Sequence, residues 1–338
     1  MESWVNIEAL DFDEEMERSD AKTIDFGYIN DAKLPRVIEG KVEDLDVWLG
    51  SNIPLVKKEL REHGAVLFRG YNLATKERFE AVASMLCDKL IANYADLPEE
   101  KGTDVVYGST PYPNTRTIYY HNESSHLSQW PLTQFFACVK ASDKGGETPI
   151  VDCRKLFKQL PDSFRKKWLA HGFLYVRNFV ANFDVSWQQF FKTEDKRLVE
   201  SACMRENMTF EWGENNSLRV AKHVKAVSEH PETQERTFFN QVQLHHPYFL
   251  DQIERDYLVQ LFGENGLPRN VMFGDGSAIS DDDMKKILSL YEENCVKFAW
   301  QNGDLLVVDN MSVAHARLPF EGSRKIIVAM GDVQHESR

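Results

Sequence analysis

The chain has 338 residues, of which 42% are hydrophobic and 12% aromatic, enough to bury the core of one elaborated domain or of two ordinary ones. Its formal net charge of -13 argues against a nucleic-acid-binding surface, which needs clustered Lys and Arg to neutralise phosphates. The N-terminus is acidic and no apolar run has the length of a membrane span, so a cytoplasmic protein is expected. Five widely spaced cysteines without a C-x-x-C pair argue against a disulfide framework and a zinc ribbon.

The N-terminal part predicts strands and two helices. Apolar residues at helical spacing between 53 and 60 predict the first helix, which Gly64 can end before the strand AVLFRG. A stripe from Phe79 to Leu90, at three- and four-residue spacing, predicts a second helix packed on a core.

Strand candidates rich in β-branched and aromatic residues dominate the rest of the chain. They are TRTIYY (115–120), LTQFFACV (132–139), FLYVRNF (173–179), TFEW (209–212), SLRVAKHV (217–224), VKFAW (296–300), DLLVVD (304–309) and RKIIVAM (324–330). TFEW and SLRVAKHV, joined by GENN, predict a hairpin, and helical patterns lie at 154–171, 249–263 and 281–294. No linker, repeat or glycine-rich nucleotide motif occurs, so we predict a mixed, β-dominant fold: one β-sandwich or barrel core with inserted helices.

Two histidines and a glutamate are the candidate metal ligands. His121 and Glu123 stand two residues apart at the end of an apolar strand, so in extended backbone their side chains project to the same side. His315 follows far downstream, in a short segment between two apolar strands that can bring it back to the pair. Two imidazoles and one carboxylate leave open positions on an octahedral ion, as non-haem Fe(II) and O2 chemistry requires, whereas a structural zinc site would need a fourth ligand.

A second histidine-x-glutamate pair, His230 and Glu232, shows that the spacing alone is weak evidence. Such pairs arise by chance in a chain with ten histidines and 53 acidic residues. Pro231 and the polar residues that follow favour a surface turn at this position, and we interpret the pair as a coincidence.

Several segments resemble the TauD/TfdA family of Fe(II)/2-oxoglutarate-dependent oxygenases, most closely its SyrP-like branch. In the family's order they are REHGAVLFRG, YYHNESSH, GGETPIVD, YVRNF, LPRN with GDGS, and GDLLVVDNMSVAHARLPFEGSRK. The resemblance implies a single oxygenase domain over residues 25–332, between an N-terminal extension (1–24) and a C-terminal tail (333–338). It also implies a double-stranded β-helix (jelly-roll, clavaminate synthase-like) core.

The resemblance further assigns residues. It implies His121, Glu123 and His315 as Fe(II) ligands and Thr148 as a hydrogen-bond donor to the cosubstrate 2-oxoglutarate. Arg324 would bind the distal carboxylate of 2-oxoglutarate, because a guanidinium offers paired donors and stays charged. The family commonly has His-Gly-Arg where this chain has His-Ala-Arg. Arg317 is expected to brace the metal loop or to contact the cosubstrate, with a structural salt bridge as the alternative.

The implied reaction uses O2 and 2-oxoglutarate to oxidise an unactivated carbon of a small molecule, in this branch often an amino acid, free or tethered to a carrier protein. Glu123 favours hydroxylation, because related halogenases have a small residue at that position. Epoxidation or desaturation, and a non-catalytic protein that binds a small acid or a partner domain, are the alternatives. Antibiotic or other secondary metabolism is the expected setting, and the oligomeric state stays open.

Other residues are candidates for the substrate. A carboxylate or amino-acid substrate needs a cation and amides near the iron, which suggests Arg177, Trp187, Asn240 and Arg269. Arg177 has an equally good alternative in a salt bridge, and Trp187 in the core. A structural role is favoured for His126, and a loop position for the pair His245-His246.

Overall fold

The computed structural model describes residues 24–40, 45–94, 97–180 and 185–336. Most of the predicted N-terminal extension and the last two residues of the predicted tail therefore lie outside the described residues. The chain divides into two compact units. Unit 1 takes its described residues from 1–118, 131–152 and 295–334, and unit 2 from 119–130, 153–294 and 335–338.

A seven-stranded sheet forms the framework of unit 1, in the order β1-β2-β3-β15-β6-β18-β4. Its strands are β1 Asp25–Tyr28, β2 Arg36–Glu39, β3 Ala65–Arg69, β4 Tyr107–Gly108, β6 Gln129–Lys140, β15 Leu305–Asp309 and β18 Lys325–His335. The pair β2 and β3 is parallel, and β15 runs antiparallel to both of its neighbours. The strands predicted at 65–70, 132–139, 304–309 and 324–330 are thereby confirmed.

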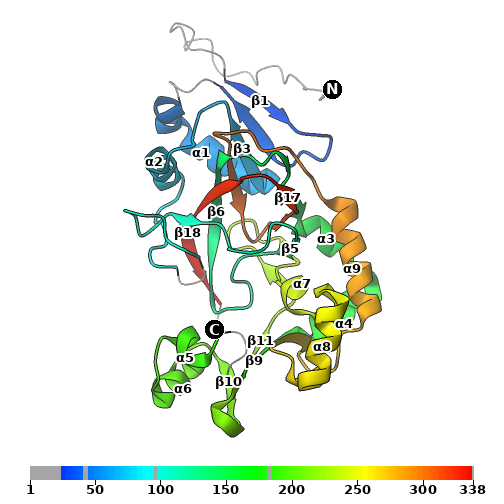
Figure 1. The fold of residues 1–338 in the computed structure, drawn as a ribbon. Helices are drawn as coiled ribbons and strands as arrows, with labels where there is room; N and C mark the ends of the chain where they lie inside the picture. The colour runs from blue at the N-terminus through cyan, green and yellow to red at the C-terminus, as the bar shows by residue number, and fades with distance from the viewer. Residues whose placement is uncertain (1–23, 41–44, 95–96, 181–184, 337–338) are drawn as a thin grey trace, which may run out of the picture. The chain divides into compact units, whose positions relative to one another are not determined.

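Both faces of this sheet are buried, as its nearly continuous apolar strands require. On β15, Leu305 and Val307 join one hydrophobic cluster, while Leu306 and Val308 join another. Helices α1 (Leu45–His63) and α2 (Lys76–Leu86) pack on the first cluster, and they lie beside β3 in Figure 1. Both helices were predicted, but the second ends at Leu86 and not at Leu90.

Unit 1 also contains two pairs of short strands and an extended segment. β8 (Ile150–Asp152) pairs antiparallel with β16 (Val313–Arg317), and β7 (Lys144–Gly145) pairs with β17 (Phe320–Glu321). The predicted strand 296–300 is wrong: only Val296 forms a bridge, to Ile150. The apolar side chains of this segment are nevertheless buried in the cluster.

A buried ion pair lies at the end of β3. Arg69, 5% exposed, donates from Nε and Nη2 to the two carboxylate oxygens of Asp304, 1% exposed, at 3.1 and 2.8 Å. Removing one partner of such a pair leaves a buried charge uncompensated. We expect Asp304→Ala to lower the free energy of unfolding by about 3–5 kcal/mol, measured by urea denaturation.

The control for this prediction is the exposed pair Lys144–Glu321, whose side chains are 77% and 72% accessible. Because solvent screens such pairs, Glu321→Ala should cost less than about 1 kcal/mol. Equal losses in the two variants would contradict the prediction.

A four-stranded sheet, β10-β11-β9-β14, is the framework of unit 2. Its strands are β9 Phe173–Phe179, β10 Met208–Trp212, β11 Leu218–Val224 and β14 Arg269–Phe273. β10 and β11 form the predicted hairpin, and every pairing in the sheet is antiparallel. β12 (Ser228–Glu229) and β13 (Arg236–Thr237) form a separate two-stranded antiparallel sheet in unit 2.

Helices make up much of the rest of unit 2, and in Figure 1 α5 and α6 lie beside β10. The α-helices are α3 Cys153–Gln159, α4 Asp162–His171, α5 Trp187–Phe191, α6 Lys196–Arg205, α7 Val242–His245, α8 Gln252–Phe262 and α9 Asp281–Asn294, with 3-10 turns at Glu214–Asn216, Pro247–Phe249 and Glu264–Gly266. The helix predicted at 154–171 is two helices, because Pro161 disfavours helical backbone at Leu160.

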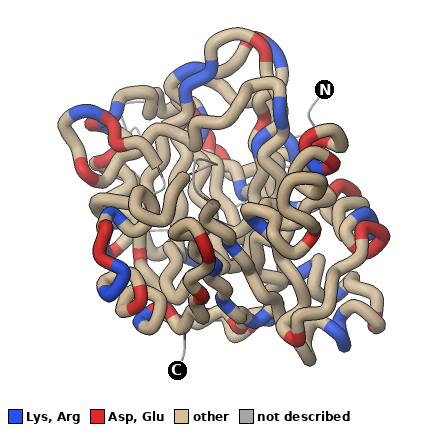
Figure 2. The backbone as a smooth tube through the Cα atoms, turned by 60° about the horizontal axis from the view of Figure 1, so that its bottom comes forward, with Lys and Arg blue, Asp and Glu red and all other residues tan. Residues whose placement is uncertain are grey.

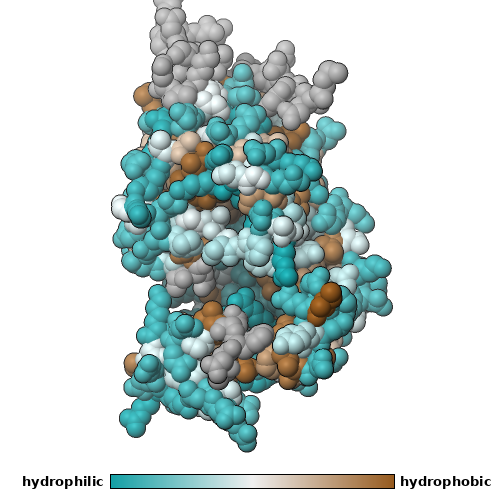
Figure 3. Space-filling model, in the orientation of Figure 1, coloured by the Kyte–Doolittle hydropathy of each residue, from teal (hydrophilic) through white to brown (hydrophobic). Residues whose placement is uncertain are grey.

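Charged residues of both signs are spread along the described part of the chain. In Figure 2, Lys and Arg are interspersed with Asp and Glu along the tube, and the face in Figure 3 is mostly hydrophilic with hydrophobic residues in small groups. All five cysteines are free, and four of them are buried. Among the described residues, the helices all fall short of the length and hydrophobicity that a membrane span needs.

Candidate metal centre and cosubstrate site

His121 ends strand β5 (Ile118–His121), and its ring is held for metal binding. Nδ1 lies 2.8 Å from the carbonyl oxygen of Tyr119. Because a carbonyl oxygen only accepts, Nδ1 donates, which makes Nε2 the ring atom that would bind a metal. Nε2 lies 4.0 Å from Oε2 of Glu123. Burial lowers the pKa of His121, which favours the neutral imidazole that binds metals.

Asn240 fixes the turn that carries these two residues. The backbone N–H of Asn122 donates to the carbonyl of Asn240 at 3.0 Å, and the N–H of Asn240 donates to Oδ1 of Asn122 at 3.2 Å. The side chain of Asn240 binds its own segment, donating to the carbonyl of Phe238 and accepting from the N–H of Val242. These contacts give Asn240 a structural role, and its predicted contact with the substrate stays a prediction.

His315 lies inside a strand, in the middle of β16, and not in a segment between strands as predicted. It is paired in register with Ile150 of β8, and its ring packs on Phe136 with centroids 5.0 Å apart. The N–H of Ala316 donates to the carbonyl of Pro149, so the chain around residue 149 runs alongside β16.

The ligand atoms of His121, Glu123 and His315 all lie within 4.8 Å of one another. No other group of three or more His, Cys, Asp or Glu side chains has this spacing within the described part of the chain. Two imidazoles and one carboxylate are the donor set of non-haem Fe(II) oxygenases, so the residues present fit such an ion. The pair His230 and Glu232 is not part of it: Nδ1 of His230 accepts from the backbone N–H groups of Glu232 and Thr233, although His230 itself is buried, not exposed.

Thr148, Trp300 and Arg324 form a polar group in unit 1. Oγ1 of Thr148 accepts from Nε1 of Trp300 at 3.1 Å and from Nη2 of Arg324 at 3.5 Å. Since a hydroxyl has two acceptor lone pairs and one donor, these contacts leave the Thr148 O–H to donate to a ligand. Trp300 was missed from the sequence, because only the fold brings it to Thr148.

Arg324 immediately precedes β18, and its side chain has other partners than that of its neighbour Lys325. Its Nε donates to the carbonyl of Gly146 at 2.9 Å, while the exposed Lys325 pairs with Glu100. Burial, with a contribution from Arg317, lowers the pKa of Arg324 to about 10, so the guanidinium stays charged at neutral pH. A half-buried guanidinium beside the Thr148 hydroxyl suits a carboxylate, because it offers paired charged donors.

The indole N–H of Trp300 gives a test of the Thr148 assignment. We expect Trp300→Phe to raise the KM for 2-oxoglutarate about 3–10-fold with little change in kcat, because an aromatic ring, though a smaller one, is kept while one hydrogen bond that orients Thr148 is lost. Steady-state kinetics with varied 2-oxoglutarate measures this. An unchanged KM would remove Trp300 from the cosubstrate site.

Arg317 braces a loop. Its guanidinium donates to the backbone carbonyls of Tyr112, Pro113 and Arg116. Within the described residues it forms no salt bridge, so the bracing alternative is the one that its contacts favour, with the braced segment at 112–116.

The remaining candidates lie in unit 2. Trp187 is buried, and its indole N–H donates to the carbonyl of Asn216, which gives it a core role. Arg177 and Arg269 face each other on β9 and β14. His245 ends helix α7 and is not in a loop as predicted, and its ring lies 5.1 Å from that of His126.

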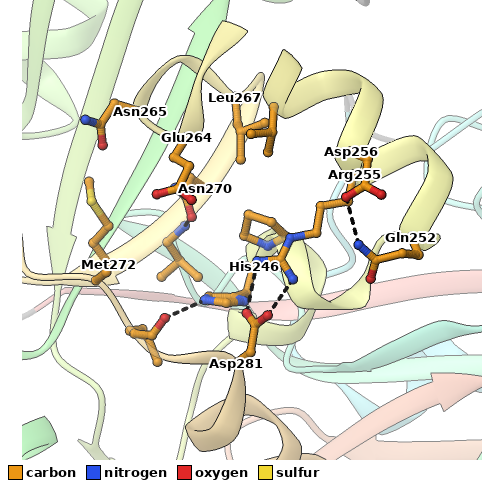
Figure 4. A pocket seen from close by; sticks show the side chains of 15 residues that line it. His246, Gln252, Arg255, Asp256, Glu264, Asn265, Leu267, Asn270, Met272 and Asp281 are labelled. Atoms are coloured by element: carbon orange, nitrogen blue, oxygen red, sulfur yellow. Dashed lines mark hydrogen bonds and ion pairs between the residues drawn. The ribbon is translucent and has the colours of Figure 1, made fainter. Parts of the chain in front are cut away.

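A separate cavity of about 450 Å³ opens in unit 2 between α8, β14 and the start of α9 (Figure 4). Its polar groups are largely paired with one another. Arg255 binds Asp281 through two hydrogen bonds, Gln252 binds Asp256, and His246 binds the carbonyl of Ile279. The cavity therefore presents no unpaired cation for an acidic substrate.

Comparison with known proteins agrees with this chemistry. The family model described as "Taurine catabolism dioxygenase TauD, TfdA family" matches residues 31–330. A jelly-roll core with a two-histidine, one-carboxylate cluster defines the class of Fe(II)/2-oxoglutarate-dependent oxygenases. The chain belongs to the TauD/TfdA family within that class, which confirms the predicted resemblance, fold, enzyme class and cofactors.

Individual relatives support the same conclusion. The chain is 34% identical to the dapdiamide synthesis protein DdaC of Enterobacter agglomerans, over 82% of this chain and 85% of that protein. It is 29% identical to a clavaminate synthase-like protein of Arabidopsis thaliana, over 80% and 82% of the two chains. Its fold is similar to that of PvcB from Pseudomonas aeruginosa, with a TM-score of 0.52, 14% identity and 94% of each chain covered.

Proposed function

We propose that this enzyme hydroxylates an unactivated carbon of an amino acid or amino-acid-derived substrate. The observation that carries the proposal is the cluster of His121, Glu123 and His315. A carboxylate in this cluster fills a position where a halogenase would leave room for chloride, so hydroxylation is the favoured outcome, with epoxidation or desaturation as the alternatives.

In the proposed site the three clustered residues would hold Fe(II), and Thr148 and Arg324 would hold 2-oxoglutarate. When bound, the iron supplies the oxidising chemistry, in which O2 and 2-oxoglutarate give succinate, CO2 and an oxidised carbon on the substrate. Hydrogen bonds to the Tyr119 carbonyl and to Asn240 hold His121 and its turn in place. Arg324 supplies the positive charge for the distal carboxylate, and Trp300 turns the Thr148 O–H towards it.

A setting in secondary metabolism is supported by the relatives. One of them takes part in dapdiamide synthesis, and PvcB is described as an Fe, alpha-ketoglutarate dependent oxygenase from an isonitrile synthetic pathway. A third, 20% identical, is a 3-((Z)-2-isocyanoethenyl)-1H-indole synthase from Fischerella ambigua. We propose a small-molecule substrate of this kind, either free or presented as a carrier-protein thioester.

The test is succinate release from 2-oxoglutarate by the Fe(II)-loaded protein under O2, with free L-amino acids and with their carrier-bound thioesters. Release that rises with one substrate, together with a product heavier by one oxygen atom, supports hydroxylation. A product lighter by two hydrogen atoms would indicate desaturation. Release that no substrate stimulates would contradict the proposed substrate class.

A further inference from the structure

One face of helix α6 in unit 2 carries only exposed side chains (Figure 1). Val199 and Cys203 point the other way and join a hydrophobic cluster with residues of β9 and β11. Since an α-helix has about 3.6 residues per turn, the face opposite this pair is formed by residues three, four, seven and eight positions apart. Its members, all exposed, are Arg197, Leu198, Ser201, Met204 and Arg205.

The composition of this α6 face is that of an interaction surface. Leu198 and Met204 are 57% and 64% exposed. Met and Arg are enriched at protein interfaces, whereas Asp and Glu are depleted there. The α6 face contains one methionine and two arginines, and none of its five residues is acidic. Exposed apolar side chains next to cations suit a partner that is both apolar and negatively charged.

The acidic residues of α6 and of its two caps are directed to other partners. The carboxylate of Asp195 caps the helix, accepting from the backbone N–H of the second helical residue at 2.8 Å. Glu200 accepts from the indole N–H of Trp212 at 2.8 Å. A carboxylate oxygen of Glu206 lies 3.9 Å from Nζ of the buried Lys222. These acids therefore do not pair with the arginines of the α6 face.

The two arginines are the unpaired charges of this helix. The side chains of Arg197 and Arg205 form no hydrogen bond or ion pair with the residues that the structure describes. Lys196, the other cation at the start of the helix, lies over the ring of Trp212, 4.3 Å from its centroid. In a chain with a net charge of -13, two unpaired cations on one helix face are a local exception. They provide charge complementarity to an acidic protein surface.

Helix α8 of the same unit shows that exposed apolar residues alone do not select such a partner. Ile253, Tyr257 and Leu261 are exposed on it at four-residue spacing, and Ile253 is 81% exposed. Glu254 and Asp256 stand next to them in the helix, so an acidic partner would meet like charges there. Of these two helices, α6 is the one whose charges fit an acidic partner.

The C-terminal end of α6 is hydrogen-bonded to the segment that carries two of the metal ligands. Oγ of Ser128 donates to the carbonyl of Glu206 at 3.3 Å, and the N–H of Ser128 donates to the Glu206 carboxylate at 3.4 Å. Ser128 lies five residues after Glu123 in the same segment of unit 2. A partner on α6 would therefore dock on an element that is attached directly to the ligand segment.

We infer that the α6 face docks an acidic carrier protein, which presents the substrate as a thioester. The inference rests on the proposed function, because it selects the carrier-bound form of the substrate and names the surface that receives the carrier. A carrier protein is usually acidic, so its docking on this acidic enzyme needs a local patch of unpaired cations. One helix face is smaller than a stable interface, so the complex is transient.

The experiment measures binding to the metal-free protein, so that it does not depend on turnover. The probes are the aminoacyl carrier proteins of the succinate assay, followed by calorimetry and stopped-flow fluorescence. We expect the double variant Arg197→Glu, Arg205→Glu to weaken carrier binding about tenfold or more, mainly through slower association, and to remove most of its salt dependence. Leu198→Gln and Met204→Gln should each weaken binding about fivefold, mainly through faster dissociation.

Unit 2 offers matched controls for both kinds of change. The double variant Lys225→Glu, Lys285→Glu alters the net charge equally at two exposed lysines outside α6. Ile253→Gln removes an apolar side chain that is even more exposed, on α8. Both controls should bind carriers as the wild type does. No binding of any carrier to the wild type, unchanged binding in the α6 variants, or equal losses in the controls would each overturn the inference.

Two other occupants of the α6 face are tested with the same variants. Sedimentation of the wild type alone tests a second copy of this chain, and vesicles of phosphatidylglycerol test an anionic membrane surface. A dimer that Leu198→Gln dissociates would overturn the inference. Capture by the vesicles but not by any carrier, lost in the double arginine variant, would also overturn it.

The failure of the docking surface and the failure of the proposed function give different results. Succinate release without substrate, measured on the Fe(II)-loaded protein, should be the same in the α6 variants and the wild type. If carriers bind through α6 but no thioester raises succinate release, the proposed function fails and the docking surface stands. If a free amino acid raises succinate release and no carrier binds, the docking surface alone fails.

Discussion

Replacing Glu123 by alanine is expected to lower iron-dependent succinate release by at least about a hundredfold, since losing partners that only support a metal ligand already costs about 10–100-fold. The substitution removes the one carboxylate of the cluster with His121 and His315. Metal titration of the purified variant by calorimetry should show weaker Fe(II) binding, while the unfolding midpoint of the metal-free protein should change little.

The chain provides its own control for this prediction. Glu232 stands two residues after a histidine, as Glu123 does, but it is exposed and lies outside the cluster. Glu232→Ala should therefore keep full activity and full metal affinity. Retained activity in Glu123→Ala would remove Glu123 from the ligand set, and an equal loss in Glu232→Ala would mean that the assay responds to general damage.

Much of the fold could be predicted because hydrophobic alternation and turn residues are local signals. The failures have physical causes that are not local. In the segment 296–300, Val296, Phe298 and Trp300 are buried and the residues between them are exposed, as in a strand. The alternation arises because every second side chain of the segment is buried in the core. Apart from the bridge at Val296, however, the segment pairs with no strand among the described residues. An apolar pattern of period two therefore indicates which side chains are buried, but it does not show that the backbone pairs with a neighbouring strand.

The residues of the candidate site also differ in how far the sequence alone could predict them. His121 and Glu123 stand in a short motif whose residue types suit a metal, and the family resemblance singled out this motif and the one that contains Thr148. The hydrogen bond from Trp300 to Thr148 joins residues far apart in the sequence, and so does the pairing of Arg177 with Arg269. Trp187 and Asn240 were candidates because of their residue types, and the structure gives both side chains hydrogen-bond partners within unit 2. Residue type can suggest a polar side chain as a candidate site residue, but only the fold shows which of its donors already have partners.

Replacing Arg324 by glutamine is expected to raise the KM for 2-oxoglutarate by roughly 30-fold or more, because truncating one partner of a buried charge pair costs about 2–5 kcal/mol. The Arg324 side chain is half-buried beside Thr148, and among the residues that the structure describes it forms no ion pair, although the charge of Glu147 acts on it. The effect should fall mainly on KM, since a saturating cosubstrate restores much of kcat when only binding is lost.

Two further variants separate charge from geometry. Arg324→Lys keeps the charge but loses the paired donors, so its KM should lie between those of the wild type and Arg324→Gln. Lys325→Gln removes a neighbouring cation that is exposed and paired with Glu100, and it should leave the KM for 2-oxoglutarate unchanged. If Lys325→Gln had the larger effect, Lys325 and not Arg324 would be the cation that binds 2-oxoglutarate. If Arg324→Gln left the KM unchanged, the distal carboxylate of 2-oxoglutarate would be held by residues other than Arg324.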